Sequence, residues 1–406
     1  MPQDIHIYSE IGKLKKVLLH RLGKEIEGLV PQNFERLLFD DIPYLKVAQQ
    51  EHDRFAEVLR ENDIEVAYYT DETAKALSRD WVRKEFILRF INESDVYSEE
   101  AKYQITDYLM NMPVKDLLDK AVNGVKKTDI DLREARSLVN YVNNSYPYYT
   151  DPMPNLYFTR DQGAFVGNGL TVHHMSTKAR RREALFLEYM YRFDRDLAQP
   201  DTPLWYDYDD PYSLEGGDIL VLSDKIVAVG LSQRTTAAGI EAFASKLLGH
   251  SSFEKILVFE IPKKRAFMHL DTVFTMVDYD KFTIHPEIEG PLQIYEITLD
   301  KEGNGRFVSI QDSLKKILAA ELGLPAVELI RCGGDDDMAA QREQWNDGSN
   351  TLAIAPGRVI TYERNYITNE LLAKKGIDVI TIPSSELSRG RGGPRCMSCP
   401  VNREDL

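Results

Sequence analysis

The chain has 406 residues, 43% hydrophobic and 28% charged, a balance typical of a globular protein with a large core. Its formal net charge of -15 argues against a nucleic-acid partner, because phosphate binding relies on clustered Lys and Arg. No apolar run approaches the roughly 18 residues that a membrane span needs. The start lacks a basic and then apolar leader, and three cysteines are an odd number, typical of a reducing compartment. We therefore expect a cytoplasmic protein without membrane association.

The first predicted strand, residues 14–19, is the loosest copy of a pattern that recurs along the chain. In this pattern a polar residue precedes a short apolar strand, a tight turn and a second strand, and several copies continue with a helix and a closing strand. Clearer copies begin at Arg160, Glu215, His269 and Ser349. Such self-similarity indicates a propeller or array, because one unit cannot bury its own apolar face. Five units around an axis would bring their leading polar residues to a common centre.

A helical segment interrupts these repeats. Strand alternation disappears between the first and second copies, and Val82, Phe86 and Phe90 stand at the i, i+4 and i+8 spacing of an apolar helical stripe. A further helix is predicted over residues 129–142. We therefore expect a helical insertion over residues 73–148. The α/β repeats then occupy residues 1–72 and 149–406.

The later copies carry further predicted elements. The Glu215 unit continues with a helix and a strand, and so does the His269 unit. The predicted helices cover residues 236–248 and 309–322, and the closing strands cover residues 255–259 and 327–330.

Acidic signatures open three of the units: Phe158-Thr159-Arg160-Asp161, Glu215-Gly216-Gly217-Asp218 and His269-Leu270-Asp271. Each alone has a simpler interpretation, as a turn aspartate, a tight glycine turn or a core histidine. Their shared position at the head of a repeat is harder to ascribe to chance. In an extended segment, residues 269 and 271 would point to the same side, so an imidazole and a carboxylate would face one cavity.

The tail contains a cysteine, Cys396, within a glycine-rich run that also holds Arg391 and Arg395. Guanidinium groups beside a thiol favour the nucleophilic thiolate, and the glycines suit a mobile loop that closes over a ligand. A buried structural cysteine, a dithiol and a metal ligand are the alternatives. Zinc would use His269, Asp271, Cys396 and Cys399, but structural zinc sites usually combine two paired clusters. A redox dithiol is disfavoured because no helix follows Cys396.

If Asp161, Glu215, His269, Asp271 and Cys396 converge, their crowded carboxylates require a cation. A guanidinium fits this need, because its planar fork of donors matches carboxylates and its central carbon is an electrophile for a thiolate. Glu215 and His269 could then move protons.

Several segments together resemble those of one known family. In combination they are closely similar to the arginine deiminases, which are guanidine-modifying enzymes, and the similarity runs nearly from end to end of the chain. The segments are residues 155–161, 176–183, 215–218, 232–235 and 268–272 and the tail around Cys396.

The resemblance implies a five-bladed pseudo-symmetric α/β propeller, the pentein fold, with an inserted helical subdomain. It implies a cytoplasmic hydrolase of linear amidines that converts free L-arginine and water to L-citrulline and ammonia in the arginine dihydrolase pathway. No cofactor or metal is implied, and the family's usual oligomers are dimers or higher.

The resemblance also assigns roles to single residues. Cys396 matches the family nucleophile, which forms a covalent amidino-thioether, and His269 and Glu215 match the proton-transfer residues. Asp161 and Asp271 match the carboxylates that bind the guanidinium. The remaining substrate contacts are Asn155, Arg180 and Arg234 at the α-carboxylate, Phe158 along the aliphatic stem, Arg391 on the mobile loop, and Asp218.

Two classes of alternative stay open. An agmatine deiminase, a methylarginine hydrolase or an amidinotransferase should differ in the carboxylate-binding arginines and in the helical insertion. A non-enzymatic arginine-binding protein would be expected to have lost Cys396 or His269, and both are present.

Overall fold

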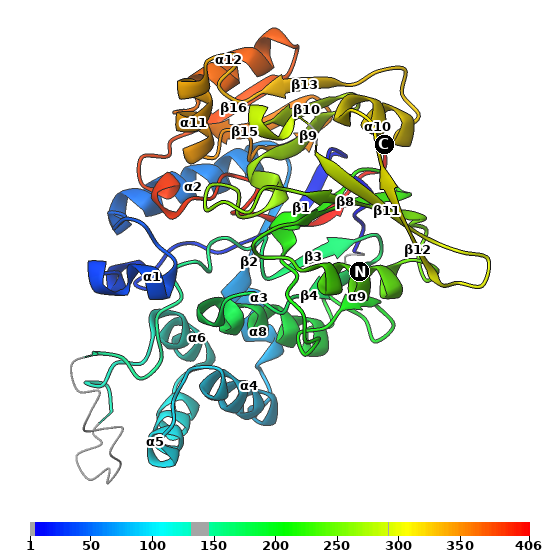
Figure 1. Ribbon diagram of the computed structural model, residues 1–406. Helices are drawn as coiled ribbons and strands as arrows, with labels where there is room; N and C mark the ends of the chain where they lie inside the picture. Colours follow the sequence, from blue (N-terminus) through cyan, green and yellow to red (C-terminus); the bar gives the residue numbers. More distant parts are fainter. Residues whose placement is uncertain (1–4, 131–145, 291) are drawn as a thin grey trace.

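The computed structural model describes residues 5–130, 146–290 and 292–406 (Figure 1). Five β-sheets occur within these residues, and each contains the same unit: two antiparallel strands followed, after a helix, by a third strand parallel to its neighbour. The predicted repeat therefore corresponds to a repeated local structure.

The first sheet joins the two ends of the chain. Strand β1 (Leu14–Leu19) pairs antiparallel with β17 (Cys399–Arg403), and Leu18 lies opposite Cys399. After α1 (Phe34–Leu37) and α2 (Leu45–Glu61), β2 (Glu65–Tyr68) pairs parallel with β1. The segment before β17 is thereby held beside the first repeat.

The second and third sheets follow the helical segment. The second consists of the hairpin β3 (Gly163–Val166) and β4 (Gly169–Val172), then α8 (Lys178–Phe193) and β5 (Leu204–Tyr206). The third begins with β6 (Ile219–Val221), β7 (Ile226–Leu231), α9 (Ala237–Leu247) and β8 (Lys255–Glu260).

The third sheet carries two strands that the sequence pattern did not predict. Strands β11 (Gln293–Leu299) and β12 (Gly305–Ile310) form a hairpin that projects at the right of Figure 1. The helix predicted over 309–322 is wrong at its start, because β12 continues to Ile310 and α10 covers only Leu314–Glu321.

The fourth and fifth sheets repeat the unit. The fourth contains β9 (Phe274–Asp278), β10 (Lys281–Ile284) and β13 (Glu328–Arg331). After α11 (Asp337–Trp345), the fifth contains β14 (Leu352–Ala355), β15 (Arg358–Tyr362) and β16 (Asp378–Ile382). Helix α12 (Tyr366–Lys374) connects β15 to β16.

Helices replace strands after β2, as the sequence predicts. They are α3 (Tyr69–Ala76), α4 (Asp80–Asn92), α5 (Glu99–Met110) and α6 (Val114–Asn123), and α4 to α6 lie at the lower left of Figure 1. The helix predicted over 129–142 falls mostly on residues outside the described ranges. That residues 73–148 form a separate insertion stays a prediction.

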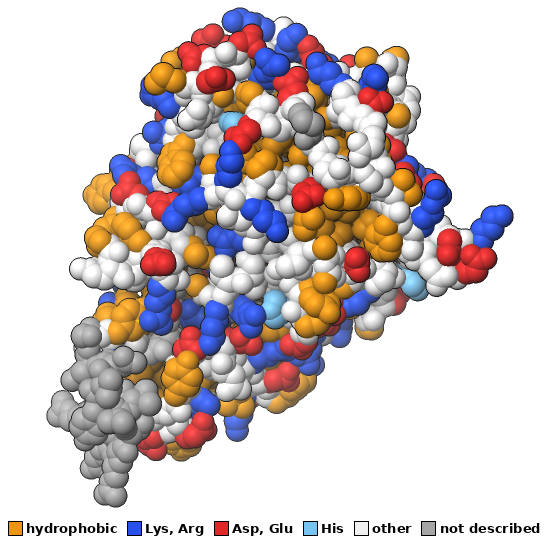
Figure 2. Space-filling view, viewed as in Figure 1, with side chains coloured by type: hydrophobic (Ala, Val, Ile, Leu, Met, Phe, Trp, Pro, Cys, Tyr) orange, Lys and Arg blue, Asp and Glu red, His pale blue; other side chains and the backbone are white. Residues whose placement is uncertain are grey.

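The apolar stripe of α4 packs against α8. The ring of Phe86 meets the rings of Phe186 and Tyr189 edge-on, at centroid distances of 5.5 and 5.1 Å. One hydrophobic cluster therefore includes residues of both the helical segment and the sheets. In the described parts of the chain no helix has the length and apolar character to cross a membrane. Acidic and basic side chains are interspersed on the face shown in Figure 2.

Candidate active site

Five polar residues stand at the same place in the five repeated units, just before the first strand of each antiparallel pair. Asp161 precedes β3, Glu215 precedes β6, His269 precedes β9, Asn350 precedes β14 and Cys396 precedes β17. Asp161, His269 and Cys396 line one cavity, which is described below. Asn350 hydrogen-bonds to Cys396 and Asp271, and Glu215 hydrogen-bonds to His269. The structure therefore brings together the leading residues that the repeat pattern selected.

Short turns give two of these residues their geometry. A single 3-10 turn follows both Glu215 and His269, and the backbone of each of these two residues is extended. Gly217, in the first turn, lies against the His269 ring, and a Cβ at this glycine would stand 2.7 Å from the ring atom Cγ. The glycine pair in the acidic signature thus permits close approach of the imidazole to its carboxylate partner.

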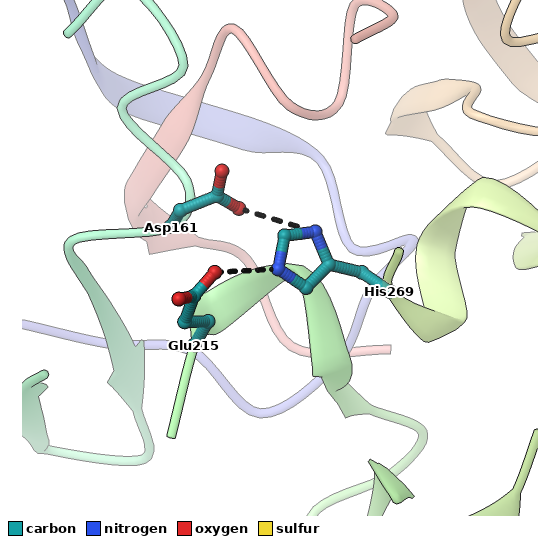
Figure 3. A group of neighbouring side chains, drawn as sticks. All are labelled: Asp161, Glu215 and His269. Carbon is teal, nitrogen blue, oxygen red and sulfur yellow. Dashed lines mark hydrogen bonds and ion pairs between the residues drawn. The ribbon is translucent and has the colours of Figure 1, made fainter. Parts of the chain in front are cut away.

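His269 lies between two carboxylates (Figure 3). Its Nε2 is 2.8 Å from Glu215 Oε2, and its Nδ1 is 3.8 Å from Asp161 Oδ1. Burial lowers the pKa of His269, but the charge of Asp161 and the hydrogen bond to Glu215 outweigh this effect and raise the pKa from 6.5 to about 9. The imidazole is therefore protonated at neutral pH.

Glu215 is also fixed from its other side. Its Oε1 accepts hydrogen bonds from the backbone nitrogen of Ser176 at 2.9 Å and from the Ser176 hydroxyl at 2.8 Å. Burial raises the pKa of Glu215, but the hydrogen bond from His269 and the charge of Arg234 have the larger effect. The pKa of Glu215 is therefore lowered, and the carboxylate stays ionised. The pair is a buried imidazolium and carboxylate.

Cys396 is buried, and its Sγ lies 3.7 Å from Asp271 Oδ2. Burial raises the pKa of the thiol well above its usual range, and the charges of Asp271 and Asp161 raise it further, while Arg395 opposes them. Arg395 thus favours the thiolate, as predicted, but burial and the carboxylates outweigh its effect on the pKa of Cys396 in this form of the protein. Arg395 is also paired with carboxylates, since it donates to Asp271 Oδ2 at 2.8 Å and to Glu10 Oε2 at 3.1 Å.

Asp161 and Asp271 each pair with one protein arginine through Oδ2. Arg180 Nη1 donates to Asp161 Oδ2 at 2.6 Å, as Arg395 does to Asp271 Oδ2. The second oxygen of each, Oδ1, is buried and has no hydrogen-bond partner. Buried acceptors without partners are costly, so a ligand with several donors would be stabilised between them.

A narrow cavity of about 30 Å³ is lined by Asp161, His269 and Cys396, whereas Asp271 and Glu215 lie outside its lining. Five predicted residues beyond the acid, imidazole and thiol groups line it: Asn155, Phe158, Arg180, Arg234 and Arg391. The lining also contains Leu38, Met268, Thr272 and Gly390, to which the sequence motifs assigned no role. Asn155 donates through Nδ2 to the Leu37 carbonyl at 2.7 Å.

Asp218 lies outside the cavity lining. Its Oδ2 accepts from the Ser232 hydroxyl at 2.7 Å, and its Oδ1 accepts from the backbone nitrogen of Leu270 at 2.8 Å. Burial raises its pKa to about 7. This geometry gives no support to the predicted substrate contact and fits a residue that positions the turn after His269.

Asn350 is the residue that the motifs missed. Its Oδ1 accepts from the backbone nitrogen of Cys396 at 3.0 Å, and its Nδ2 donates to the Asp271 carbonyl at 3.1 Å. Asn350 thus links the tail to the turn that carries Asp271. Its position at the head of the fifth repeat was the available signal.

The zinc alternative does not match the geometry. Cys399 points away from the proposed ligands, because its thiol donates to the Gly163 carbonyl at 3.5 Å. Among the described residues, only Asp161, Glu215 and His269 bring three possible metal ligands within 4.8 Å of one another. These three residues form ion pairs with one another, Asp161 also pairs with Arg180, and Glu215 accepts a hydrogen bond from Ser176.

Comparison with known proteins identifies close relatives of the whole chain. A family model described as arginine deiminase matches residues 35–403. The arginine deiminase of Clostridium perfringens is 53% identical over 99% of this chain and 98% of its own length. The arginine deiminase of Latilactobacillus sakei subsp. sakei is 50% identical over 100% of both chains.

Solved structures with lower sequence identity share the fold. An amidinotransferase of Microseira wollei from saxitoxin biosynthesis superposes with a TM-score of 0.53 at 14% identity, covering 99% of this chain and 98% of its own. The DDAH of Pseudomonas aeruginosa superposes with a TM-score of 0.51 at 16% identity, covering 96% and 99%. The shared architecture is a mixed α/β fold with several sheets.

Proposed function

The chain belongs to the arginine deiminase family, and from this premise we propose that it hydrolyses free L-arginine to L-citrulline and ammonia. The enzyme is a hydrolase acting on a C–N bond of a linear amidine. One observation carries the proposal: a buried thiol and an imidazolium stand beside two aspartates, each with a buried oxygen that lacks a hydrogen-bond partner. A guanidinium supplies the missing donors in a planar fork.

The rest of the cavity suits the amino-acid end of arginine. Phe158 lines the cavity and offers an apolar surface for the aliphatic stem. Arg180, Arg234 and Arg391, together with Asn155, supply donors for the α-carboxylate. This set would disfavour agmatine, which lacks a carboxylate, because the buried donors would remain without an acceptor.

The substrate cation supports ionisation of the nucleophile. In the substrate-free form, Asp161 and Asp271 help to keep the Cys396 thiol protonated. A guanidinium bound between these carboxylates brings a positive charge close to the sulfur and lowers the pKa of the thiol. The thiolate would then form where its electrophile is already bound.

The reaction proceeds in two steps through a covalent intermediate. The Cys396 sulfur adds to the guanidinium carbon, His269 donates a proton to the departing nitrogen, and ammonia leaves an amidino-thioether on the sulfur. The neutral imidazole then takes one proton from water as the hydroxide adds to the same carbon. The C–S bond breaks, the remaining hydroxyl proton passes to the departing sulfur, and citrulline and the Cys396 thiol separate. Asp161 and Asp271 stabilise the positive charge on the intermediate.

Substrate entry requires the site to open. The cavity volume of about 30 Å³ is far below the roughly 300–1,000 Å³ of typical ligand pockets. Arg180 also occupies one oxygen of Asp161. Arginine would displace Arg180 from Asp161, which frees the Arg180 guanidinium for the substrate carboxylate, and the glycine-rich tail loop would move to admit it.

The proposal extends to architecture and context. The five sheets of the described residues support a five-bladed α/β propeller over residues 1–72 and 149–406 with a helical insertion over 73–148. The protein would act in the cytoplasm, in arginine catabolism through the arginine dihydrolase pathway, as a homo-oligomer. Neither a metal nor a cofactor takes part in the proposed chemistry.

Citrulline formation from three substrates tests this function. We expect release of citrulline and ammonia from L-arginine, with far slower turnover of agmatine and methylarginine. Cys396→Ala should lower kcat by roughly 10⁴-fold or more, because it removes the nucleophile. Turnover by Cys396→Ala would contradict the nucleophile assignment, and a preference for agmatine or methylarginine would contradict the substrate.

A further inference from the structure

The guanidinium of Arg391 is buried with unused hydrogen-bond donors. The residue is only 7% exposed and lines the cavity, yet its Nε and Nη1 have no hydrogen-bond partner. The Nη1 atom lies 3.9 Å from Asp40 Oδ2, which is too long for a hydrogen bond. Buried donors in a cavity wall indicate a ligand that supplies acceptors.

An aromatic ring holds this guanidinium in place. The Cζ atom of Arg391 lies 3.5 Å from the ring centroid of Trp345, the last residue of α11. A guanidinium stacked on a ring uses its face for the contact, so its N–H groups, which lie in its plane, stay available. Trp345 is 47% exposed, so it is not an ordinary core residue.

The backbone around Arg391 is fixed separately. Arg391 has left-handed backbone angles, with φ 64° and ψ 55°, an uncommon conformation for a residue other than glycine. Its backbone nitrogen donates to the Ser388 carbonyl at 3.1 Å, and the Tyr362 hydroxyl donates to the Gly392 carbonyl at 2.8 Å. These hydrogen bonds fix the backbone position of Arg391, and the contact with the Trp345 ring fixes the position of its guanidinium.

We propose that Trp345 is a positioning residue for substrate selection: its ring presents the free donors of Arg391 to the carboxylate of the incoming amino acid. The inference rests on the proposed function and names a residue outside the cavity lining. A substrate carboxylate would satisfy donors that the protein leaves buried and unpaired. An analogue without a carboxylate would leave them unpaired, so the stack contributes to selectivity rather than to chemistry.

Steady-state kinetics of Trp345→Leu tests the inference. The leucine keeps an apolar side chain but removes the π face, so we expect KM for arginine to rise about 3- to 30-fold while kcat changes less than about 2-fold. Trp345→Phe retains a ring and should show a smaller rise. The slow turnover of agmatine should change less than that of arginine, so the arginine preference falls.

Trp81 provides a matched control. It is 55% exposed and lies on α4, away from the cavity lining, and the Arg79 guanidinium carbon lies 5.4 Å from its ring centroid. Trp81→Leu should leave both KM and kcat for arginine unchanged. Thermal melting of the variants checks that each one folds. If Trp345→Leu does not fold, Trp345→Phe still tests the inference.

A double-mutant cycle separates positioning from a general structural effect. If Trp345 acts through Arg391, Trp345→Leu should add almost nothing to KM in an Arg391→Ala background. An unchanged KM in Trp345→Leu, or an equal rise in both backgrounds, would overturn the inference while wild-type turnover still supports the function. Absence of citrulline from the wild-type enzyme would overturn the function and the inference together.

Discussion

Both His269 and Cys396 are protonated in the substrate-free protein, so the site does not contain a preformed thiolate beside a neutral imidazole. Two carboxylates raise the pKa of His269 to about 9, and burial together with nearby carboxylates keeps Cys396 as a thiol. In the substrate-free protein both side chains therefore carry their protons. In the proposed mechanism, bound arginine supplies the positive charge that lowers the pKa of the thiol, so the reactive thiolate forms only with the substrate in place.

The pH dependence of kcat/KM tests the role of Glu215. Since His269 must be protonated to donate to the nitrogen that departs as ammonia, kcat/KM should fall as pH rises through about 9, the pKa of His269. Glu215→Gln removes the charge that Glu215 adds, so the pKa of His269 falls and this loss of activity moves to lower pH.

A second buried pair supplies the control for this profile. His20 Nε2 lies 3.2 Å from Glu25 Oε1, and neither residue lines the cavity. Glu25→Gln should leave the decline near pH 9. An unshifted profile in Glu215→Gln would contradict the assignment of the decline to the His269 and Glu215 pair.

Single residues show how far the sequence was informative. The repeat heads Asp161, Glu215 and His269 do meet, because identical local structures place them equivalently. Arg395 does lower the pKa of Cys396, but adjacency in sequence does not reveal that burial and the carboxylates outweigh it, or that the guanidinium pairs with Glu10 and Asp271. Those contacts join segments far apart in the chain.

At the scale of elements, helix α2 anchors the segment that leads to Arg391 and Cys396. Glu51 on α2 is buried and accepts hydrogen bonds from the Ser385 hydroxyl at 2.7 Å and from the backbone nitrogens of Glu386 and Leu387, both at 2.9 Å. The segment that leads to Arg391 is therefore held to α2 at its start.

Glu51→Gln tests this anchor. The amide keeps the shape but loses the charge and one acceptor oxygen, so we expect kcat/KM to fall about tenfold, equivalent to about 1.4 kcal/mol. Glu57→Gln on the exposed face of the same helix should have no effect. Equal kinetics of Glu51→Gln and the wild-type enzyme would show that the anchor does not position the loop.

Exposure explains why the sequence pattern did not predict strand β12. Strand β12 forms an exposed edge of its sheet, so its apolar residues do not alternate with a buried face. Helix α9, by contrast, was predicted to within one residue at each end, because its apolar face is buried against the sheet. Burial on one side creates the periodic signal, and an exposed edge does not.

For the whole molecule, the return of the last strand to the first is decisive. Strand β17 pairs with β1, which places Cys396 beside residues contributed by the other sheets. The repeat pattern predicted the units, but no local pattern could show that the tail completes the first of them. The resemblance to a known family assigned Cys396 a role but did not predict this pairing.

The helical segment is expected to unfold together with the sheets. Phe86 of α4 packs on Phe186 and Tyr189 of α8 within one hydrophobic cluster. Calorimetry should therefore show one cooperative transition, and Phe86→Ala should lower the free energy of unfolding by about 3–5 kcal/mol. Tyr103→Ala on α5, where the ring is 67% exposed, should change it little. A separate early transition for the helices would contradict a shared core.

Mass spectrometry of acid-quenched enzyme during turnover of arginine tests covalent catalysis most directly. We predict an amidino adduct on the peptide that contains Cys396, formed within the time of one turnover and lost as citrulline appears. Turnover without this adduct would contradict the proposed mechanism. So would an adduct that lies on Cys332 or Cys399 and not on Cys396.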